Sequence, residues 1–145
     1  MGTGTGLAPF LSVIKDPETY ERFEKVVLLH GCRRVKELAY GEMITEKLPD
    51  DELIGDCIRN QLIYYPTVTR DPFRNRGRIT DLITSGKLFA DIGLQGLEAE
   101  HDRVMICGSP ALVADTRVLL TERGFVEGNH GEAAQFVVEK AFAER

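Results

Sequence analysis

The chain has 145 residues, of which 43% are hydrophobic and 28% charged, a composition that indicates one globular domain and argues against a disordered or membrane class. The formal net charge of -5 disfavours non-specific binding to nucleic acid, so any anion-binding site must be local. The apolar stretches are far shorter than the roughly 20 residues that cross a bilayer, and no signal peptide opens the chain, so we expect a cytoplasmic protein with no membrane contact.

Helices and strands are predicted to alternate along the chain. A glycine turn over residues 1–6 leads into a helix over about 7–15, and a second helix starts at 16–17, with aspartate as its cap and proline in its first turn. Residues 26–29 predict a strand whose apolar residues are consecutive, as in a parallel strand that is covered by helices on both faces.

The middle of the chain predicts one helix and one strand. Apolar residues spaced four apart predict a helix over about 35–48, which ends at 49–51. Residues 60–69 are rich in aliphatic, aromatic and β-branched side chains and predict a strand that is interrupted at Pro66, with its far end irregular or at a sheet edge.

The last third predicts two helices and two strands. Residues 78–85 predict a helix, and residues 104–107 predict a buried strand that leads into a helix with Ser109 as cap and Pro110 in its first position. A last strand is expected over 135–139. Strands that alternate with helices predict an α/β fold with a parallel sheet flanked by helices, and we expect one domain over residues 1–145.

The cysteines and histidines do not predict a metal site. Cys32, Cys57 and Cys107 form neither a CxxC pair nor an even set, which favours reduced thiols over disulfides or zinc ligands. The three histidines are scattered in the same way, so we expect no metal.

The first residues of the chain form a candidate anion site: Gly2, Thr3, Gly4, Thr5 and Gly6. Glycines let the backbone turn tightly and come close to a phosphate, and the free N–H groups and the dipole of the following helix both favour a pyrophosphate. A flexible glycine-rich start is the alternative. The run is not a GxGxxG motif followed by the acidic residue that binds a ribose in NAD proteins.

The run GTGTGLAPFLS (2–12) is similar to the pyrophosphate loop of the ferredoxin reductase family. Four further segments follow in the order of that family: LLHGCRR (28–34), VTRDPFRNRGRITDLI (68–83), MICGSP (105–110) and FVVEKAF (136–142). Together they cover nearly the whole chain, and they resemble the bacterial ferredoxin or flavodoxin reductases. The resemblance implies a Rossmann-like domain that binds NADP(H).

Basic residues are the candidates for recognising the 2′-phosphate of NADP. Thr69, Arg70 and Arg78 offer a hydroxyl and two permanently charged groups that suit a dianionic phosphate. The resemblance implies that the two arginines hold the 2′-phosphate and that Arg33, from the HxxR motif, lies near the same end of the nucleotide. A solvated basic loop is the alternative for the arginines over residues 70–78.

The resemblance also implies two residues at the reacting end. Cys107 of the CGxP motif would lie by the nicotinamide and position it by packing, with Gly108 allowing close approach and Ser109 and Pro110 starting the next helix. A small core residue is the alternative for Cys107. Phe142 is similar to the aromatic residue that covers the flavin in the bacterial subclass and moves aside for turnover; a frayed apolar terminus is its alternative.

The family's reductases carry an N-terminal barrel that holds FAD, and neither this barrel nor the first strand of the nucleotide domain is present in the sequence. We therefore expect the NADP(H)-binding part of a ferredoxin/flavodoxin–NADP reductase, an oxidoreductase that passes hydride between NADP(H) and FAD and exchanges single electrons with ferredoxin or flavodoxin. The isolated fragment is expected to be inactive. The alternatives are a non-catalytic nucleotide-binding module and an NADH-dependent oxygenase reductase, which Arg70 and Arg78 disfavour.

Overall fold

The computed structural model describes residues 1–128 and 134–139. The strands are β1 (Gly2–Thr3), β2 (Val26–Cys32), β3 (Leu62–Val68), β4 (Val104–Ile106) and β5 (Phe136–Val138). The α-helices are α1 (Ala8–Lys15), α2 (Pro17–Arg22), α3 (Gly55–Gln61), α4 (Ile79–Thr84), α5 (Lys87–Ile92) and α6 (Pro110–Glu122). Short 3-10 helices cover Gly4–Leu7, Val35–Glu37 and Leu48–Asp50, and a π-helical turn covers Met43–Lys47.

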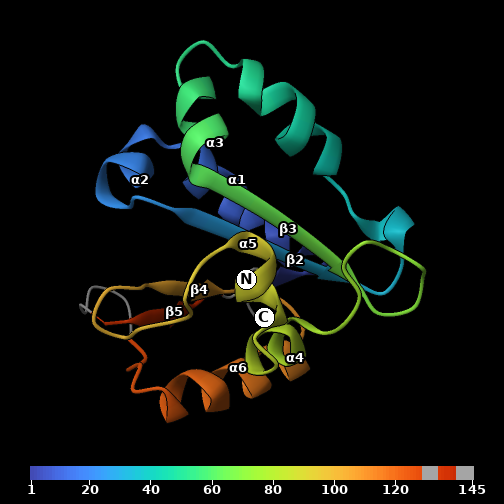
Figure 1. Cartoon of the computed structure of the whole chain (residues 1–145), viewed down its shortest axis with the longest axis vertical. Coiled ribbons are helices and arrows are strands. Elements are labelled where there is room, and N and C mark those ends of the chain that lie inside the picture. The colour runs from blue at the N-terminus through green and yellow to red at the C-terminus, as the bar shows by residue number, and fades with distance from the viewer. Residues whose placement is uncertain (129–133, 140–145) are drawn as a thin grey trace, which may run out of the picture.

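All strand pairs are parallel, as the sequence predicted (Figure 1). One sheet has the order β1-β2-β3 and a second sheet pairs β4 with β5. β1 links the two sheets, because Gly2 pairs with His30 on one side and forms a bridge to Cys107 on the other. The glycine-rich start of the chain therefore lies between β2 and β4, at the carboxyl ends of both strands.

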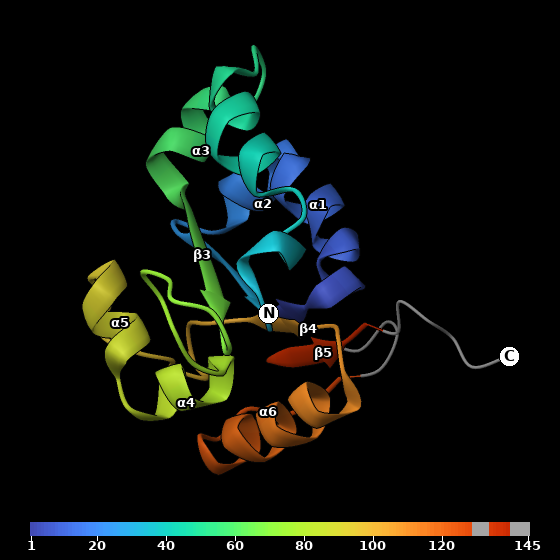
Figure 2. The same ribbon diagram turned by 90° about the vertical axis from the view of Figure 1, so that its right-hand side faces the viewer.

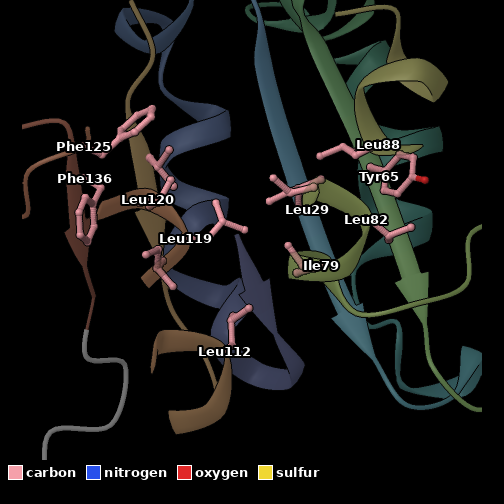
Figure 3. Packing of buried hydrophobic residues seen from close by; sticks show 13 residues of the cluster. Leu29, Tyr65, Ile79, Leu82, Leu88, Leu112, Leu119, Leu120, Phe125 and Phe136 are labelled. Atoms are coloured by element: carbon pink, nitrogen blue, oxygen red, sulfur yellow. The ribbon is translucent and has the colours of Figure 1, made fainter. Parts of the chain in front are cut away.

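Helices cover both faces of the strands (Figure 2). Leu28 and Leu29 are consecutive residues of β2, yet they belong to two different apolar clusters. The cluster of Leu29 includes residues of α4, α5 and α6 (Figure 3). The cluster of Leu28 includes residues of α1, α2 and α3. This two-sided burial confirms the prediction from consecutive apolar residues.

The predicted caps of the helices are confirmed. The side chain of Asp16 accepts a hydrogen bond from Glu18 N at 3.0 Å at the start of α2. The side chain of Ser109 accepts one from Leu112 N at 3.2 Å, and Pro110 is the first residue of α6. The predicted helix over 78–85 is α4. Over the described residues, no helix combines the length and the apolar character needed to cross a membrane.

The predicted continuous helix over 35–48 is wrong. The chain forms a 3-10 turn at Val35–Glu37, and Tyr40 then takes a left-handed conformation with φ 70, which ends any helix. Val35 is 40% exposed, whereas Ile44 is 2% exposed. The apolar stripe therefore does not face one partner, and only the part after the break packs into the core.

The predicted strand over 60–69 is present, but it differs from the prediction in its first residue and in its course at Pro66. It begins at Leu62, because α3, which the sequence analysis did not predict, continues to Gln61. Pro66 does not interrupt the strand and pairs with His30. β3 is the last strand in the order of its sheet, as expected, and an edge strand tolerates the missing N–H of proline.

Candidate functional site

A cavity of about 840 Å³ lies at the carboxyl ends of the first three strands and at the start of α6. Ligands of parallel α/β sheets bind at this edge. The predicted site residues that line the cavity are Thr3, Gly4, Thr5, Gly6, Arg33, Thr69, Arg70, Arg78, Gly108, Ser109 and Pro110. Segments from four separate parts of the sequence thus meet around one space.

The glycine loop packs against the start of α6 without room for side chains. A Cβ atom on Gly6 would lie 2.5 Å from the carbonyl oxygen of Cys107, and one on Gly108 would lie 2.2 Å from Oγ1 of Thr3. Gly108 also has φ +151, a conformation that other residues rarely adopt. Both positions therefore require glycine.

Hydrogen bonds connect the glycine loop to α6. Thr3 N donates to the carbonyl of Cys107 at 3.2 Å, and Ser109 N donates to Oγ1 of Thr3 at 2.9 Å. The loop runs into α1 after the 3-10 turn at Gly4–Leu7, and α6 begins at Pro110. The N-termini of two helices thus lie at one end of the cavity, where their dipoles favour an anion.

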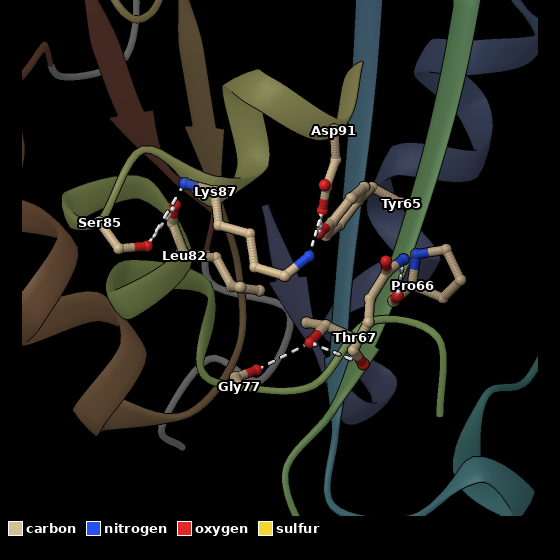
Figure 4. Close-up of polar contacts among 9 residues, drawn as sticks. Tyr65, Pro66, Thr67, Gly77, Leu82, Ser85, Lys87 and Asp91 are labelled. Atoms are coloured by element: carbon tan, nitrogen blue, oxygen red, sulfur yellow. Dashed lines mark hydrogen bonds and ion pairs between the residues drawn. The ribbon is translucent and has the colours of Figure 1, made fainter. Parts of the chain in front are cut away.

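The arginine loop, residues 69–78, returns to the end of β3 and is closed by side-chain hydrogen bonds (Figure 4). Oγ1 of Thr67 donates to the carbonyl of Gly77 at 2.8 Å, and Nδ2 of Asn75 donates to the carbonyl of Pro66 at 2.9 Å. The backbone N–H of Gly77 donates to the carbonyl of Val68 at 2.9 Å. These contacts fix both ends of the loop.

The same loop is tied to the segment that follows β2. Thr69 N donates to the carbonyl of Cys32 at 3.1 Å, and Arg70 N donates to the carbonyl of Arg33 at 2.8 Å. Asp71 extends this contact, because its carboxylate accepts from Arg34 Nη1 at 3.0 Å and from Val35 N at 2.8 Å. The backbone therefore brings Thr69, Arg70 and Arg33 to the same wall of the cavity.

Of the four arginines over residues 70–78, two line the cavity, and Arg74 and Arg76 do not. Arg70 and Arg78 line the cavity, and within residues 1–128 and 134–139 neither forms an ion pair. Arg74 instead lies over the ring of Phe73 at 5.2 Å, and it does not line the cavity. Two guanidinium groups of the loop thus lie at the cavity with no ion-pair partner among the described residues, which is the arrangement that an anion site requires.

Two predicted site residues, Gly2 and Cys107, do not line the cavity, and a third falls outside the part of the chain that the structure describes. Gly2 is buried in β1, and Cys107 is 1% exposed and packs in the cluster that contains Leu7 and Phe10. Cys107 contacts the site through its carbonyl, which accepts from Thr3 N. Phe142 lies outside the described residues.

The sequence analysis missed Glu37 and Asp115, which also line the cavity. Neither belongs to a chemical pattern that a single sequence makes visible. It also assigned no role to His30, which is fully buried beneath the glycine loop. In the part of the chain that the structure describes, no three histidine, cysteine or acidic side chains are grouped to hold a metal.

Comparisons with known proteins agree with this geometry. Ferredoxin–NADP reductase A of Sorangium cellulosum is 58% identical over 143 residues, which are 99% of this chain and 51% of that protein. The ferredoxin–NADP reductase of Pseudomonas aeruginosa is 55% identical over 146 residues, which are 100% of this chain and 57% of that protein. The chain thus spans about half the length of the curated relatives that it matches.

A solved structure gives the same result for the fold. The ferredoxin NADP+ reductase of Neisseria gonorrhoeae, determined with bound FAD and NADP, is 28% identical with a TM-score of 0.80, over 97% of this chain and 54% of that one. Residues 1–118 match the family of oxidoreductase NAD-binding domains. The chain therefore belongs to the oxidoreductase NAD-binding domain family.

Proposed function

We propose that the chain is the NADP(H)-binding part of a ferredoxin/flavodoxin–NADP reductase, an enzyme that transfers hydride between NADP(H) and FAD and exchanges single electrons with ferredoxin or flavodoxin. The observation that carries the proposal is one cavity that combines a glycine loop with two arginines, Arg70 and Arg78, that have no partner among the described side chains. The names of the curated relatives support the same function.

Each end of the cavity suits one phosphate group of NADP. The backbone N–H groups of the glycine loop and the two helix N-termini suit the pyrophosphate. Thr69, Arg70 and Arg78 suit the 2′-phosphate, because guanidinium groups bind phosphate oxygens with paired, charged hydrogen bonds, and Arg33 lies on the same wall. The volume of about 840 Å³ is within the range of cofactor sites.

At the reacting end, Gly108 leaves room for the nicotinamide, and Cys107 packs in the apolar cluster behind this part of the site and holds the glycine loop through its carbonyl. Because the thiol of Cys107 is 1% exposed, we assign it a packing role and no nucleophilic one. Bound FAD would exchange the hydride with NADP(H). The residues that hold FAD are assigned to the part of the reductase outside this chain, with Phe142 as the one contact expected from this chain.

The free cysteines support a cytoplasmic location for the enzyme. Cys32, Cys57 and Cys107 are all unpaired, and reducing compartments keep thiols in that state.

We further propose that residues before Met1 in the full-length protein lengthen β1 into a complete strand between β2 and β4. A second cavity of about 290 Å³ is lined by consecutive residues of β2, from Val26 to Leu29, and by Val104 and Met105 of β4. The amino group of Met1 donates to the carbonyl of Met105 at 2.7 Å, where a strand would place a peptide N–H. Burial lowers the pKa of this amino group to about 5, so a peptide bond suits the position better than a charge.

The pH dependence of stability tests this strand. Between pH 5 and 8 the unfolded chain binds the proton on its amino group and the folded chain does not, so stability should rise with pH by about 1.4 kcal/mol per unit. A protein extended before Met1 should lose this slope and keep the smaller one from His30, whose pKa burial also lowers. Urea unfolding at pH 5.5 and 7.5 measures both. Equal slopes in the two proteins would contradict the proposed strand.

The choice of nucleotide tests the proposed function. Arg70→Ala in the full-length protein should weaken NADP+ binding by roughly tenfold to a hundredfold, and it should leave NAD+ binding nearly unchanged. Arg74→Ala is the matched control, because Arg74 belongs to the same loop but packs on Phe73. Titration calorimetry of the wild type and both variants with both nucleotides gives the six values needed. An equal loss for NADP+ and NAD+ would show that Arg70 does not read the 2′-phosphate and would favour an NADH-dependent reductase.

A further inference from the structure

A buried histidine lies directly beneath the glycine loop. His30 is 0% exposed, near the carboxyl end of β2, where β1 pairs with it through Gly2. Buried polar groups in folded proteins have hydrogen-bond partners, and those of His30 define what it can do.

The partners of His30 fix the position of its proton. Nε2 lies 3.1 Å from the carbonyl oxygen of Gly4, which can only accept, so Nε2 carries the hydrogen. Nδ1 lies 3.5 Å from the hydroxyl of Tyr64 and is left to accept from it. Burial lowers the pKa of His30, in agreement with a neutral ring, and it raises the pKa of Tyr64 to about 12, so that hydroxyl stays a donor.

Cys32 continues the same network toward the arginine wall. Its Sγ lies 3.4 Å from Nε2 of His30 and donates to the carbonyl of Glu37 at 3.4 Å. The carbonyl of Cys32 itself accepts from Thr69 N. The hydroxyl of Tyr64 therefore donates to Nδ1 of His30, and Nε2 of His30 donates to the glycine loop.

The contact with Gly4 bears on which backbone groups of the loop face the cavity. Gly4 has φ +54 and begins the 3-10 turn Gly4–Leu7, and His30 adds a side-chain donor to its carbonyl. The hydrogen bond to His30 turns the Gly4 carbonyl into the protein. If that oxygen pointed into the cavity, its partial negative charge would repel a phosphate.

We propose that His30 is a positioning residue for the pyrophosphate: through Nε2 it holds the Gly4 carbonyl away from the cavity and leaves the loop N–H groups to bind the anion. This inference rests on the proposed function, because it assumes a pyrophosphate ligand. It requires no particular assignment of the 2′-phosphate.

Two amide substitutions in the full-length reductase test the proposal. The amide nitrogen of glutamine reaches about as far as Nε2, whereas that of asparagine reaches only as far as Nδ1. His30→Asn should weaken NADP+ and NAD+ binding alike, by about tenfold, and His30→Gln should restore most of it.

The second ligand in the test is 2′-AMP, which has the 2′-phosphate but no pyrophosphate. Its affinity should not change in either variant. Equal losses for NADP+ and 2′-AMP, unchanged NADP+ binding in His30→Asn, or no difference between the two amides would overturn the proposal.

A substitute variant and a comparison with Arg70→Ala separate the possible outcomes of the test. If His30→Asn does not fold, Tyr64→Phe serves instead, because it removes the hydroxyl that lies 3.5 Å from Nδ1 and helps to hold the ring of His30 in place. It should weaken NADP+ and spare 2′-AMP, and unchanged NADP+ binding would overturn the proposal. A failure of the proposed function gives a different result. Arg70→Ala would then lose NADP+ and NAD+ affinity equally, while His30→Asn and His30→Gln would still differ in their binding of the pyrophosphate-containing nucleotides.

Discussion

Backbone atoms form the surface of one end of the cavity, and side chains form the surface of the other. At the glycine end, backbone atoms form the surface, and Gly6 and Gly108 pack so closely on their neighbours that no Cβ fits. At the arginine end, exposed side chains such as Arg70 and Arg78 form the surface, on a loop held by hydrogen bonds. A substitution at the glycine end has to move the backbone, whereas a substitution at the arginine end can replace one side chain and leave the backbone in place.

Under the proposed function, this difference separates the two parts of nucleotide recognition. The pyrophosphate is common to NAD and NADP, and we propose that it binds at the end where shape is fixed. The 2′-phosphate distinguishes the two nucleotides, and we propose that it binds at the end where charge is carried by long side chains. Substitutions at the glycine end should therefore affect both nucleotides, and those at the arginine end should affect NADP alone.

Gly6→Ala should have the largest effect. Its Cβ would lie 2.5 Å from the carbonyl oxygen of Cys107 and 2.8 Å from Cα of Gly108, and both are backbone atoms that cannot turn aside. We expect a loss of about 1 to 3 kcal/mol in stability from overpacking, and a loss of about a hundredfold or more in affinity for both nucleotides.

Gly41→Ala is the control for this substitution, because a Cβ there would lie 3.7 Å from the hydroxyl of Tyr64, an ordinary contact. Thermal denaturation and nucleotide titration of the two variants give the comparison. Nucleotide binding by Gly6→Ala at the level of the wild type would mean that the close packing at the glycine end is not needed for recognition.

The local sequence pattern signals the glycine end more directly than the arginine end, where the family resemblance selected Arg70 and Arg78. Glycines next to a helix signal the loop directly, and the consecutive apolar residues of β2 signal a strand buried on both faces. The arginines over 70–78 look alike in the sequence, and only the path of the loop separates Arg70, which lines the cavity, from Arg74, which stacks on Phe73. That path depends on hydrogen bonds between residues far apart in the chain.

The remaining errors have a similar cause. The stripe that begins at Val35 has helical spacing, but a left-handed residue at Tyr40 breaks the helix, and spacing does not reveal it. The role of His30 depends on partners in β3 and in the glycine loop, which are 34 and 26 residues away in the sequence. Spacing within one segment carries no information on such contacts.

Thr67→Val should have the smallest effect, and it tests whether the arginine loop must be held in place. Thr67 is 1% exposed, and its Oγ1 donates to the carbonyl of Gly77 at 2.8 Å, at the base of the loop (Figure 4). Valine keeps the shape and loses this bond, so we expect a stability loss of about 1 kcal/mol.

The arginines themselves remain in Thr67→Val, and so NADP+ affinity should fall only about twofold to threefold, which is equivalent to about 0.4 to 0.7 kcal/mol. NAD+ affinity should stay the same. Thr45→Val is a matched control, because Thr45 also donates to a backbone carbonyl at 2.8 Å, that of Gly41, and does not line the cavity. If Thr67→Val weakened NADP+ and NAD+ equally, the two ends of the cavity would be coupled through β3, and the separation of shape from charge would not hold.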